Sequence, residues 1–517
     1  MKKLTKLLAL LLCAILTFSL VVGCGNDENE NKEDTIYAVC INKGYGTDWV
    51  DALLKRFCEK NPDYKYEVEK VYSDDQIIDK IESGEQYCRW DLAFNGATFA
   101  ANTDYLLSLN DVYNWEIPDG SRQGTTVISN VDENALKGLV KVENDQDVYY
   151  AMPWTAEVGG ICVNNDAVKA KLGEDWKKTY PCRTTDELLE FCAALKSAGL
   201  EPLMHSATND YYGGISKVWF AQYNGEQGVT NYFEGRYATP TGVDIGPAVA
   251  KNVGVLKAYE VLEEIGKGGY YYSDGYGLEW DVAQTMFMSG AAAMLPIGDW
   301  VQTEMNKQYP NVDVQFIRYP VLSALAVDKL GITDDELSNV VAYVDGDVSE
   351  KPTINSTKEL SSDEVINQVK VARSWSNSYV NNFTVCIPEY SHKADIAKEF
   401  LKFMVSDEGQ EVYARSTNGL TMCYGWNLEE NTDVWNSIGN FAKSRWPIVK
   451  NARFLIRDRW ETYGKAGLTP FRATEIAPIP ILLSREKNPY TAQMAYDYDY
   501  ETYEREWAAI VAKVDAD

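Results

Sequence analysis

The residues that could carry catalytic chemistry are few in this chain. It has only two histidines, His205 and His392, so a Ser-His-Asp triad and a histidine-rich metal site have little support. Its ten cysteines include no Cys-x-x-Cys pair, which argues against zinc ribbons and thioredoxin-like sites. We therefore predict no catalytic residues, no metal site and no cofactor.

The abundant carboxylates leave one enzymatic alternative open, a surface glycoside hydrolase. The chain has 77 acidic residues, and glycoside hydrolysis needs two carboxyl groups about 5 to 10 Å apart. No recognisable catalytic run accompanies these carboxylates, so the hydrolase stays a minor alternative. The aromatic content of 12% suits the faces of sugars but also fills protein cores, and composition alone supports a carbohydrate ligand only slightly.

The first 24 residues have the pattern of a bacterial lipoprotein signal. Basic residues precede an apolar run over residues 7–22, which is too short to span a bilayer comfortably, and small residues precede Cys24. We expect cleavage after residue 23 and lipidation, with palmitate, of Cys24. The alternatives are an ordinary secretory signal and a single anchor helix. Each of them places the rest of the chain at the extracytoplasmic side of the bacterial cell membrane.

The segment after Cys24 has the composition of a tether, and the whole chain is strongly acidic. Residues 25–34 contain no apolar side chain, so we expect residues 24–35 to form a lipidated linker. The formal net charge of −28 disfavours nucleic acid and anionic lipid headgroups as partners. Attachment to the membrane is therefore expected to depend on the lipid at Cys24.

Eight cysteines remain outside the predicted signal and lipidation site. They are too few for a dense disulfide framework in a chain of 517 residues. Cys40, Cys162 and Cys386 lie in apolar, strand-like runs, where a cysteine behaves as a small buried hydrophobic residue. We therefore predict mostly free thiols.

Alternating strand and helix patterns open the folded part of the chain. The expected strands cover residues 35–41, 66–71 and 92–94, and the expected helices begin at Thr47 or Asp48 and cover 75–82. This βαβαβ order predicts a mostly parallel sheet. Because such sheets bind ligands at the carboxyl ends of their strands, we expect the ligand loops at residues 42–47 and 95–98.

A second α/β region is expected over about residues 159–320. Within it, Thr184 and Glu187 have the spacing of a capping box, in which each side chain bonds to the backbone N–H of the other residue. Gly199 is placed to end the helix that they begin.

Residues 287–300, FMSGAAAMLPIGDW, combine a helix end, a glycine, an Ala-Met strand and a Gly-x-Trp turn. This segment resembles the extracellular solute-binding proteins of ABC sugar importers, the maltose-binding group or family 1, in its lipoprotein form. Three further segments, at residues 150–169, 184–203 and 395–414, resemble the same family and occur in the order expected of it. The resemblance covers roughly residues 36–420.

This resemblance implies an α/β, type II periplasmic-binding-protein-like fold with two lobes, an interlobe cleft and a hinge. It implies capture of a carbohydrate, here expected to be an oligosaccharide, for an ABC importer by hinge closure. The expected partners are the permease subunits and their ATPase, and the binder is expected to be a monomer with no enzymatic activity. A peptide, a polyamine or a metal chelate is the alternative ligand of the same fold.

The resemblance also implies how the chain divides between the lobes. The expected parts are the signal peptide at 1–23, the tether at 24–35, lobe one at 36–153 plus 377–420, lobe two at 158–322 plus 425–517, and an insertion at 330–375. The region from 330 to 375 is rich in Asp, Glu and Ser and has no counterpart in the four matching segments. The tail after residue 425 matches the family only loosely.

Four site residues follow from the strongest matches. Trp300 falls on the Gly-x-Trp aromatic that packs against a pyranose face in sugar binders, and an ordinary core tryptophan is the alternative. Asp299 beside it could accept hydrogen bonds from sugar hydroxyls. Glu157 aligns with an acidic acceptor of such hydroxyls, with a hinge salt bridge as the alternative. Trp154 either lines the same cleft or packs the hinge.

Weaker matches add four residues and one aromatic cluster. Asn42 and Lys43 lie in a loop that resembles the first sugar-contacting loop of the family, although Lys43 has the alternative of a solvated charge. Asn95 ends the third strand of the same lobe. Trp219 is a second stacking candidate for which core packing is the favoured account, and the tyrosines at 270–272 could widen the cleft.

Overall fold

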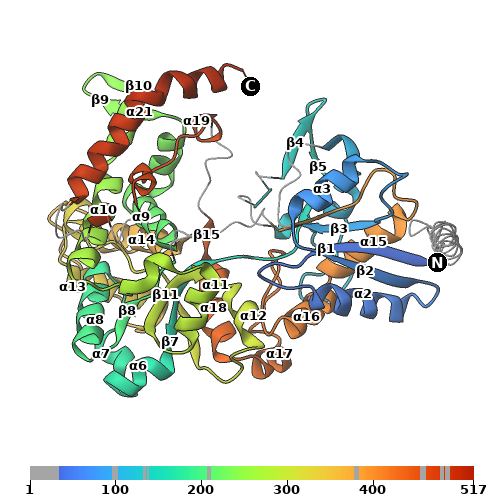
Figure 1. Ribbon diagram of the computed structural model, residues 1–517, viewed down its shortest axis with the longest axis horizontal. Helices are drawn as coiled ribbons and strands as arrows, with labels where there is room; N and C mark the ends of the chain where they lie inside the picture. The colour runs from blue at the N-terminus through green and yellow to red at the C-terminus, as the bar shows by residue number, and fades with distance from the viewer. Residues whose placement is uncertain are drawn as a thin grey trace, which may run out of the picture.

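The computed structural model has two lobes, with the N-terminal lobe on the right of Figure 1. The described residues are 34–95, 103–131, 135–136, 139–206, 211–377, 383–454, 462–477, 482–483 and 490–516. The predicted signal peptide, Cys24, nearly all of the predicted tether and residues 96–98 of a predicted ligand loop lie outside them. Within the described ranges, no helix is long and apolar enough to cross a membrane.

Lobe one is built on a five-stranded sheet in the order β2-β1-β3-β14-β6. Its strands are β1 (Thr35–Ile41), β2 (Lys65–Val71), β3 (Leu92–Asn95), β6 (Met152–Pro153) and β14 (Thr384–Cys386). β1 is parallel to β2 and to β3, which confirms the predicted βαβαβ unit. β14 is antiparallel to both β3 and β6. Every residue of β1 is buried, which explains its continuous apolar sequence.

Helices and a hairpin surround this sheet (Figure 1). They are α2 (Asp48–Lys60), α3 (Asp74–Glu82), α4 (Asn110–Tyr113), the hairpin β4 (Val140–Glu143) and β5 (Gln146–Tyr149), α15 (Ala394–Val405) and α16 (Asp407–Ser416). The helix α2 begins at Asp48 with Thr47 at its N-cap, as predicted, but the Thr47 side chain makes no capping hydrogen bond. Two acidic residues in the first turn, Asp48 and Asp51, favour this helix end instead, because they face the positive end of the helix dipole.

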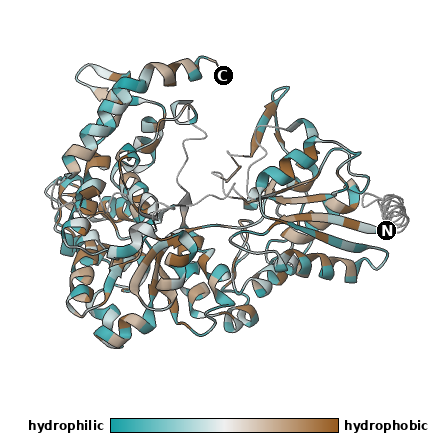
Figure 2. Cartoon of the chain, viewed as in Figure 1, coloured by the Kyte–Doolittle hydropathy of each residue, from teal (hydrophilic) through white to brown (hydrophobic). Residues whose placement is uncertain are grey.

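Lobe two is built on a four-stranded sheet in the order β12-β7-β11-β8. Its strands are β7 (Gly159–Asn164), β8 (Glu201–Leu203), β11 (Ala292–Gly298) and β12 (Val314–Ile317). β11 is antiparallel to β7 and parallel to β8. In Figure 2 the hydrophobic residues gather in the strands of both sheets and in the helix faces against them. One apolar cluster covers lobe one and continues into lobe two, and a second cluster fills the rest of lobe two.

The helices of lobe two lie on both sides of its sheet (Figure 1). They are α6 (Asn165–Leu172), α7 (Trp176–Thr179), α8 (Thr185–Ser197), α9 (Tyr211–Phe233), α10 (Val253–Lys267), α11 (Trp280–Met288) and α12 (Val301–Asn306), with the hairpin β9 (Arg236–Thr239) and β10 (Gly242–Ile245). Thr184 caps α8 by accepting the Glu187 N–H. Glu187 accepts the N–H of Arg183 and not that of Thr184, so only half of the predicted capping box forms.

The region from 330 to 375 forms two helices, α13 (Asp334–Asp345) and α14 (Ser362–Ser374), which pack on each other around a small apolar cluster. Each helix begins with a complete capping box, Thr333 with Glu336 and Ser361 with Glu364. Arg373 of α14 pairs with Asp345 of α13 at 2.8 Å. The two helices therefore form a small unit, and its origin as an insertion stays a prediction.

The C-terminal segment returns to both lobes. Its described elements are β13 (Trp375–Ser376), α17 (Thr432–Ser437), α18 (Asn440–Asn451), β15 (Arg453–Phe454), α19 (Thr462–Lys465) and α21 (Ala492–Val514). α18 lies against β12, where Ser444 Oγ accepts the Phe316 N–H at 2.8 Å. α21 lies against α10 on the outer side of lobe two (Figure 1).

Three segments cross between the lobes and bond to one another. The Trp154 N–H donates to the carbonyl of Phe383, and the Ala156 N–H donates to the carbonyl of Thr421. The hydroxyl of Ser376 donates to the carbonyl of Gly159 at 2.8 Å. These crossings form the hinge region, in which a small set of residues links the two lobes.

The eight cysteines of the described residues are all free thiols, as predicted. Cys40, Cys162 and Cys386 lie in β1, β7 and β14 and are fully buried. Burial raises the pKa of each of these thiols, because the apolar surroundings disfavour a thiolate. They therefore act as small apolar core residues.

Candidate functional site

A cavity of about 1060 Å³ opens between the two lobes. Lobe one contributes the loop at residues 42–47 after β1, the start of α2 and the end of β2. Lobe two contributes α11 and α12, and residues 416–418 at the end of α16 complete the wall. The predicted ligand loop at residues 42–47 therefore lies at the boundary between the lobes, opposite Trp300.

Trp300 is half-buried at the N-cap of α12 and lines this cavity. Its ring lies directly over Gly298, where a Cβ would come within 1.7 Å of a ring carbon. The Gly-x-Trp spacing is thus a packing requirement, since no other residue leaves space for the ring. The loop of lobe one approaches from the other side, and a Cβ at Gly44 would be 3.3 Å from the Trp300 Cβ. Trp300 is therefore fixed where the lobes meet.

Asp299 lies beneath the cavity and is fully buried. The hydroxyl of Tyr45 donates to one of its carboxylate oxygens at 2.6 Å, and Nε of Arg445 donates to the other. Arg445, which is also fully buried, donates to the carbonyl of Ala156 at 2.6 Å. Both oxygens of Asp299 are occupied, so the geometry favours a structural role over the predicted role as an acceptor of sugar hydroxyls.

Glu157 and Trp154 lie in the crossing segment below the cavity and do not line it. Glu157 is 2% exposed, and its charge contributes to the raised pKa of the Tyr45 hydroxyl, after burial and the charge of Asp299. Trp154 is fully buried and stacks on Trp49 with ring centroids 4.4 Å apart. Of its two predicted roles, the structure shows the packing role at the hinge.

Asn42 and Lys43 line the cavity, as the loop match implied. The Asn42 N–H donates to the carbonyl of Val71, which fixes the loop to the end of β2. Lys43 is half exposed and pairs with Asp74 of α3 at 3.1 Å. Its ammonium group is close to the cavity but already has a partner at the surface.

Asn95 and Trp219 lie away from the cavity. Asn95 is buried at the end of β3, where its side-chain oxygen accepts the Thr384 hydroxyl at 3.2 Å. Trp219 is fully buried in the core of lobe two and donates its indole N–H to the carbonyl of Pro320. Trp219 is a stacking candidate from the sequence, but no face of its ring is exposed, which agrees with the favoured account of core packing. The tyrosines at 270–272 also do not line the cavity.

Many lining residues were missed in the sequence, and four of them are aromatic or polar side chains of special interest. Tyr72, at the end of β2, is 70% exposed, and Trp280, at the start of α11, is 40% exposed. Gln284 and Glu304 lie deeper, on α11 and α12. A signal did exist, because Trp280 and Gln284 are four residues apart, as are Trp300 and Glu304, and such pairs share a helix face.

Glu304 is the most perturbed carboxyl group of the cavity. Burial raises its pKa to about 7, and hydrogen bonds from Gln284 and from the Gly44 amide act in the opposite direction. The side-chain amide of Gln284 donates to it at 2.9 Å. Since Gly44 belongs to lobe one, Glu304 forms a polar contact between the lobes at the floor of the cavity.

A family model described as bacterial extracellular solute-binding protein matches residues 52–437. This match covers well over half of the chain. The chain belongs to this family. It is therefore an extracytoplasmic solute-binding protein, and the predicted α/β two-lobe fold is confirmed. No curated protein sequence matches the chain.

Solved structures of several binding proteins resemble the solute-binding protein along most of its length. The GacH receptor of Streptomyces glaucescens, solved unliganded and with acarbose, has 15% identity and a TM-score of 0.53, covering 92% of this chain and 98% of that chain. MalE3 of T. maritima, solved with maltose, has 13% identity and a TM-score of 0.54, with 91% and 99% coverage. A chitin oligosaccharide binding protein has 13% identity and a TM-score of 0.55, with 91% and 98% coverage. At such identities the likeness shows the shared fold.

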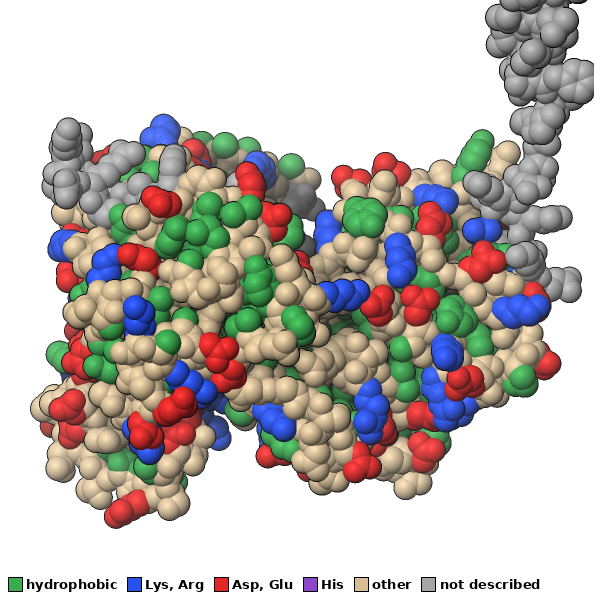
Figure 3. Space-filling model, turned by 60° about the horizontal axis from the view of Figure 1, so that its bottom comes forward, with side chains coloured by type: hydrophobic (Ala, Val, Ile, Leu, Met, Phe, Trp, Pro, Cys, Tyr) green, Lys and Arg blue, Asp and Glu red, His purple; other side chains and the backbone are tan. Residues whose placement is uncertain are grey.

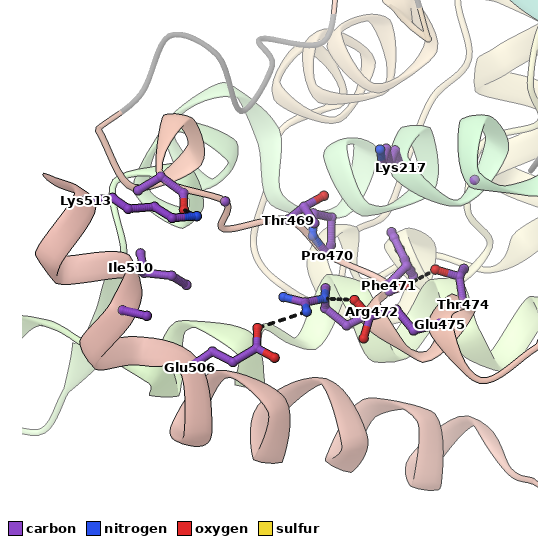
Figure 4. A pocket seen from close by; sticks show the side chains of 14 residues that line it. Lys217, Thr469, Pro470, Phe471, Arg472, Thr474, Glu475, Glu506, Ile510 and Lys513 are labelled. Atoms are coloured by element: carbon purple, nitrogen blue, oxygen red, sulfur yellow. Dashed lines mark hydrogen bonds and ion pairs between the residues drawn. The ribbon is translucent and has the colours of Figure 1, made fainter. Parts of the chain in front are cut away.

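A second cavity of the solute-binding protein, about 540 Å³, lies within the C-terminal part of lobe two (Figure 4). Arg472 crosses it, pairing with Glu475 at 2.5 Å and with Glu506 at 2.9 Å. Lys513 donates to the carbonyl of Ala466 at 3.4 Å. Its main charged groups are satisfied within one lobe, so lobe movement would not open or close this cavity around a ligand.

The surface of the solute-binding protein is mixed in charge despite the acidic total. On the face in Figure 3, lysines and arginines alternate with aspartates and glutamates, and no large area carries one sign. Among the described residues, no three His, Cys, Asp or Glu side chains lie close enough to hold a metal ion. The interlobe cavity, with its aromatic rings and hydrogen-bonding groups, is therefore the candidate solute site.

Proposed function

We propose that this solute-binding protein captures a carbohydrate, an oligosaccharide, for an ABC importer by closing its two lobes around it. The observation that carries the proposal is the position of Trp300, half-buried at the interlobe cavity with its ring held over Gly298. A flat, immobile ring suits the C–H face of a pyranose. The three structural relatives described above support it, since they bind acarbose, maltose and a chitin oligosaccharide.

The rest of the cavity supports a sugar ligand of more than one ring. Trp280 and Tyr72 are further exposed aromatic residues, and they come from opposite lobes. Cavities of about 300 to 1,000 Å³ typically hold drug-sized ligands, so about 1060 Å³ leaves space for several rings. Closure would bring the two aromatic residues toward the ligand from both sides, and the closed form would be the state recognised by the permease.

Within the proposed site, the predicted residues divide into two groups. Trp300, Asn42 and Lys43 line the cavity and are retained as ligand contacts. Glu157 is retained as a candidate acceptor of hydrogen bonds from sugar hydroxyls, which it would contact only after the lobes close. Asp299 and Trp154 are proposed to support the hinge, and Asn95 is proposed to stabilise the β3–β14 pairing.

The cellular setting completes the proposal. A lipid on Cys24 would anchor the protein to the outer face of the cell membrane, with residues 24–35 as the tether. Two permease subunits and an ATPase would complete the importer, with the binder as a monomer. The division into lobe one at 36–153 plus 377–420 and lobe two at 158–322 plus 425–517 is proposed as the unit of movement, with 330–375 as an insertion on lobe two.

Calorimetry on the chain from residue 26 onward tests this proposal, beginning with mono- and oligosaccharides and adding peptides, polyamines and metal chelates. We expect tight binding of an oligosaccharide without its breakdown. Trp300→Ala should weaken that binding by about 0.5 to 1.5 kcal/mol or more, because the stacking contact is lost. Trp435→Ala, at a partly buried tryptophan remote from the cavity, is the control and should bind as the parent does.

Other outcomes of this experiment would redirect the proposal. Unchanged affinity in Trp300→Ala would remove Trp300 from the ligand site. Binding only of peptides, amines or chelates would keep the fold and overturn the carbohydrate ligand. Breakdown of the sugar would revive the glycoside hydrolase.

A further inference from the structure

Two helices of lobe two each bring a tryptophan and a polar side chain to the interlobe cavity. On α11, Trp280 precedes Gln284 by four residues, and at the start of α12, Trp300 precedes Glu304 by four residues. Side chains four residues apart lie on one helix face, and all four of these residues line the cavity. Each helix thus places an aromatic ring beside a hydrogen-bonding group, and a sugar ring needs both kinds of partner.

The two polar members of these pairs contact each other. The side-chain amide of Gln284 donates to a carboxylate oxygen of Glu304 at 2.9 Å, which leaves the amide oxygen of Gln284 facing elsewhere. That oxygen is fully buried and has no hydrogen-bond partner among the described residues. A buried acceptor without a donor costs free energy, and a ligand hydroxyl reached by a small movement would relieve that cost.

The charges of the cavity select against an anionic ligand. Its cations already have partners, since Lys43 pairs with Asp74, Lys307 with Asp48, and Lys70 with Asp51. In contrast, Glu304 and Asp281, which also line the cavity, form no ion pair within the described part of the chain. Where Glu304 is ionised, a ligand that enters therefore meets two carboxylates without an ion pair, which repel acidic sugars and attract hydroxyl donors.

We infer that Gln284 and Glu304, flanked by Trp280 and Trp300, determine specificity by binding the hydroxyl groups of a neutral saccharide. The inference rests on the proposed function, and it names the class of ligand and the residues that recognise that ligand. Glu304 also accepts the amide of Gly44 from lobe one, so the same carboxylate that binds the ligand helps to hold the lobes together. Recognition and closure would then share one side chain.

The inference predicts a pH profile for ligand affinity. Burial raises the pKa of Glu304 to about 7, and the charge of Asp281 on α11 acts in the same direction. The other charged groups of the cavity are Lys43 and Asp48 near the loop of lobe one, Lys70 on β2 and Lys307 after α12. Because hydroxyl donors bind the ionised carboxylate more strongly, affinity for a neutral saccharide should rise with pH through about 7 and then level off.

The test uses calorimetry from pH 5.5 to 8.5 with a neutral oligosaccharide found to bind the parent. Glu304→Gln should lower the affinity about tenfold at pH 8, because a charged hydrogen bond is replaced by a neutral one, and should flatten the pH profile. Glu304→Asp keeps the charge, so the profile should persist at lower affinity. Glu279→Gln removes an equal charge at the exposed start of α11 and should leave both quantities unchanged.

The outcomes distinguish failure of the proposed function from failure of this inference. If the parent binds no saccharide, the proposed function fails. If the parent binds one and Glu304→Gln keeps the same affinity and pH profile, the inference is overturned while the proposed function stands. Trp280→Ala covers the case in which Glu304→Gln does not fold. Because Trp280 is exposed, this variant should keep its melting temperature, and retention of parental affinity would overturn the inference.

The same experiment tests the preference for a neutral ligand by comparing a neutral with an acidic oligosaccharide. An oligosaccharide of equal length that carries uronic acid carboxylates should bind the parent at least tenfold more weakly than the neutral one. It should gain affinity in Glu304→Gln, where one repelling charge is absent. Equal or tighter binding of the acidic sugar by the parent would contradict the inference.

Discussion

Asp299 and Arg445 form an ion pair in which neither side chain is exposed to solvent. Arg445 also donates to the carbonyl of Ala156, and Asp299 accepts the hydroxyl of Tyr45. Transfer of both charges from water is costly, so this pair persists only because its hydrogen bonds are nearly all made. It joins α18, the end of β11 and the loop of lobe one at a single point beneath the ligand cavity.

Removal of one partner of this pair should destabilise the protein strongly. Arg445→Met leaves Asp299 buried and uncompensated, which should lower the free energy of unfolding by about 3 to 5 kcal/mol. Urea denaturation followed by tryptophan fluorescence measures the change. Arg415→Met breaks an exposed pair with Glu411 and should cost less than about 1 kcal/mol. A loss of similar size in both variants would contradict the structural role of Arg445.

At the residue scale, the sequence predicts Trp300 better than it predicts the partners of Asp299. Gly298 and Trp300 carry a local signal, because the space needed by the ring fixes a glycine two residues away. Arg445 lies 146 residues from Asp299, and no spacing rule connects them. Gln284 and Glu304 each follow a tryptophan by four residues, but α11 has nine residues and α12 has six, and such short helices have little periodicity to detect.

Among the elements, α21 is held in place by one buried carboxylate. Asp499 accepts the N–H groups of Phe471 at 3.0 Å and of Ala473 at 2.9 Å, and it accepts the hydroxyl of Tyr259 on α10. Phe471 has a φ of 68°, a left-handed conformation that is strained for a residue with a side chain. Asp499 thus fixes both the final helix and the strained turn before it.

The titration of Asp499 should make stability depend on pH. Burial raises its pKa to about 7, so between about pH 4 and 7 the folded protein keeps a proton that the unfolded chain has lost. Its contribution to stability is complete below about pH 4 and is lost as the pH rises through 7. In Asp499→Asn this decline should be smaller by about 2 to 4 kcal/mol across the same range.

Unfolding free energies of parent and variant at pH 4.5 and 7.5 test this expectation. Other carboxyl groups also titrate in this range, so the difference between the two proteins is the quantity of interest. Glu501→Gln, at an exposed position on the same helix, should follow the parent. A parental slope in Asp499→Asn would show that Asp499 is ionised throughout.

Periodicity at the element scale predicts the first half of lobe one well. The strands β1, β2 and β3 and the helices between them follow from apolar or alternating runs and helical spacing, because the signal of each lies within its own few residues. The short strands β6 and β14 are not predictable in this way. They have two and three residues, and their place in the sheet depends on pairing with distant segments.

For the whole molecule, the fold places its cavity between two lobes, which the described crossing segments connect and whose apolar residues are in contact. Movement about those segments is expected to change the distance between Trp280 and Tyr72 more than any distance within a lobe. The ligand makes contacts with both lobes, so it should stabilise the more closed arrangement in proportion to those extra contacts.

Small-angle X-ray scattering should detect this closure. With a saturating neutral oligosaccharide, the radius of gyration of the parent should fall measurably. Trp300→Ala at the same ligand concentration, if it remains unsaturated, should keep the larger radius. An unchanged radius in the saturated parent would contradict closure as the response to the ligand.

The position of β14 in the first sheet has a consequence for how the protein is made. This strand, at residues 384–386, lies between β3 and β6, so the sheet of lobe one has a gap until most of the chain is available. The core of lobe two is likewise incomplete until α18 and α21 have been synthesised. Pairings between such distant segments form slowly. Neither lobe can complete its core early during synthesis, which suits a chain that has to cross a membrane before it folds.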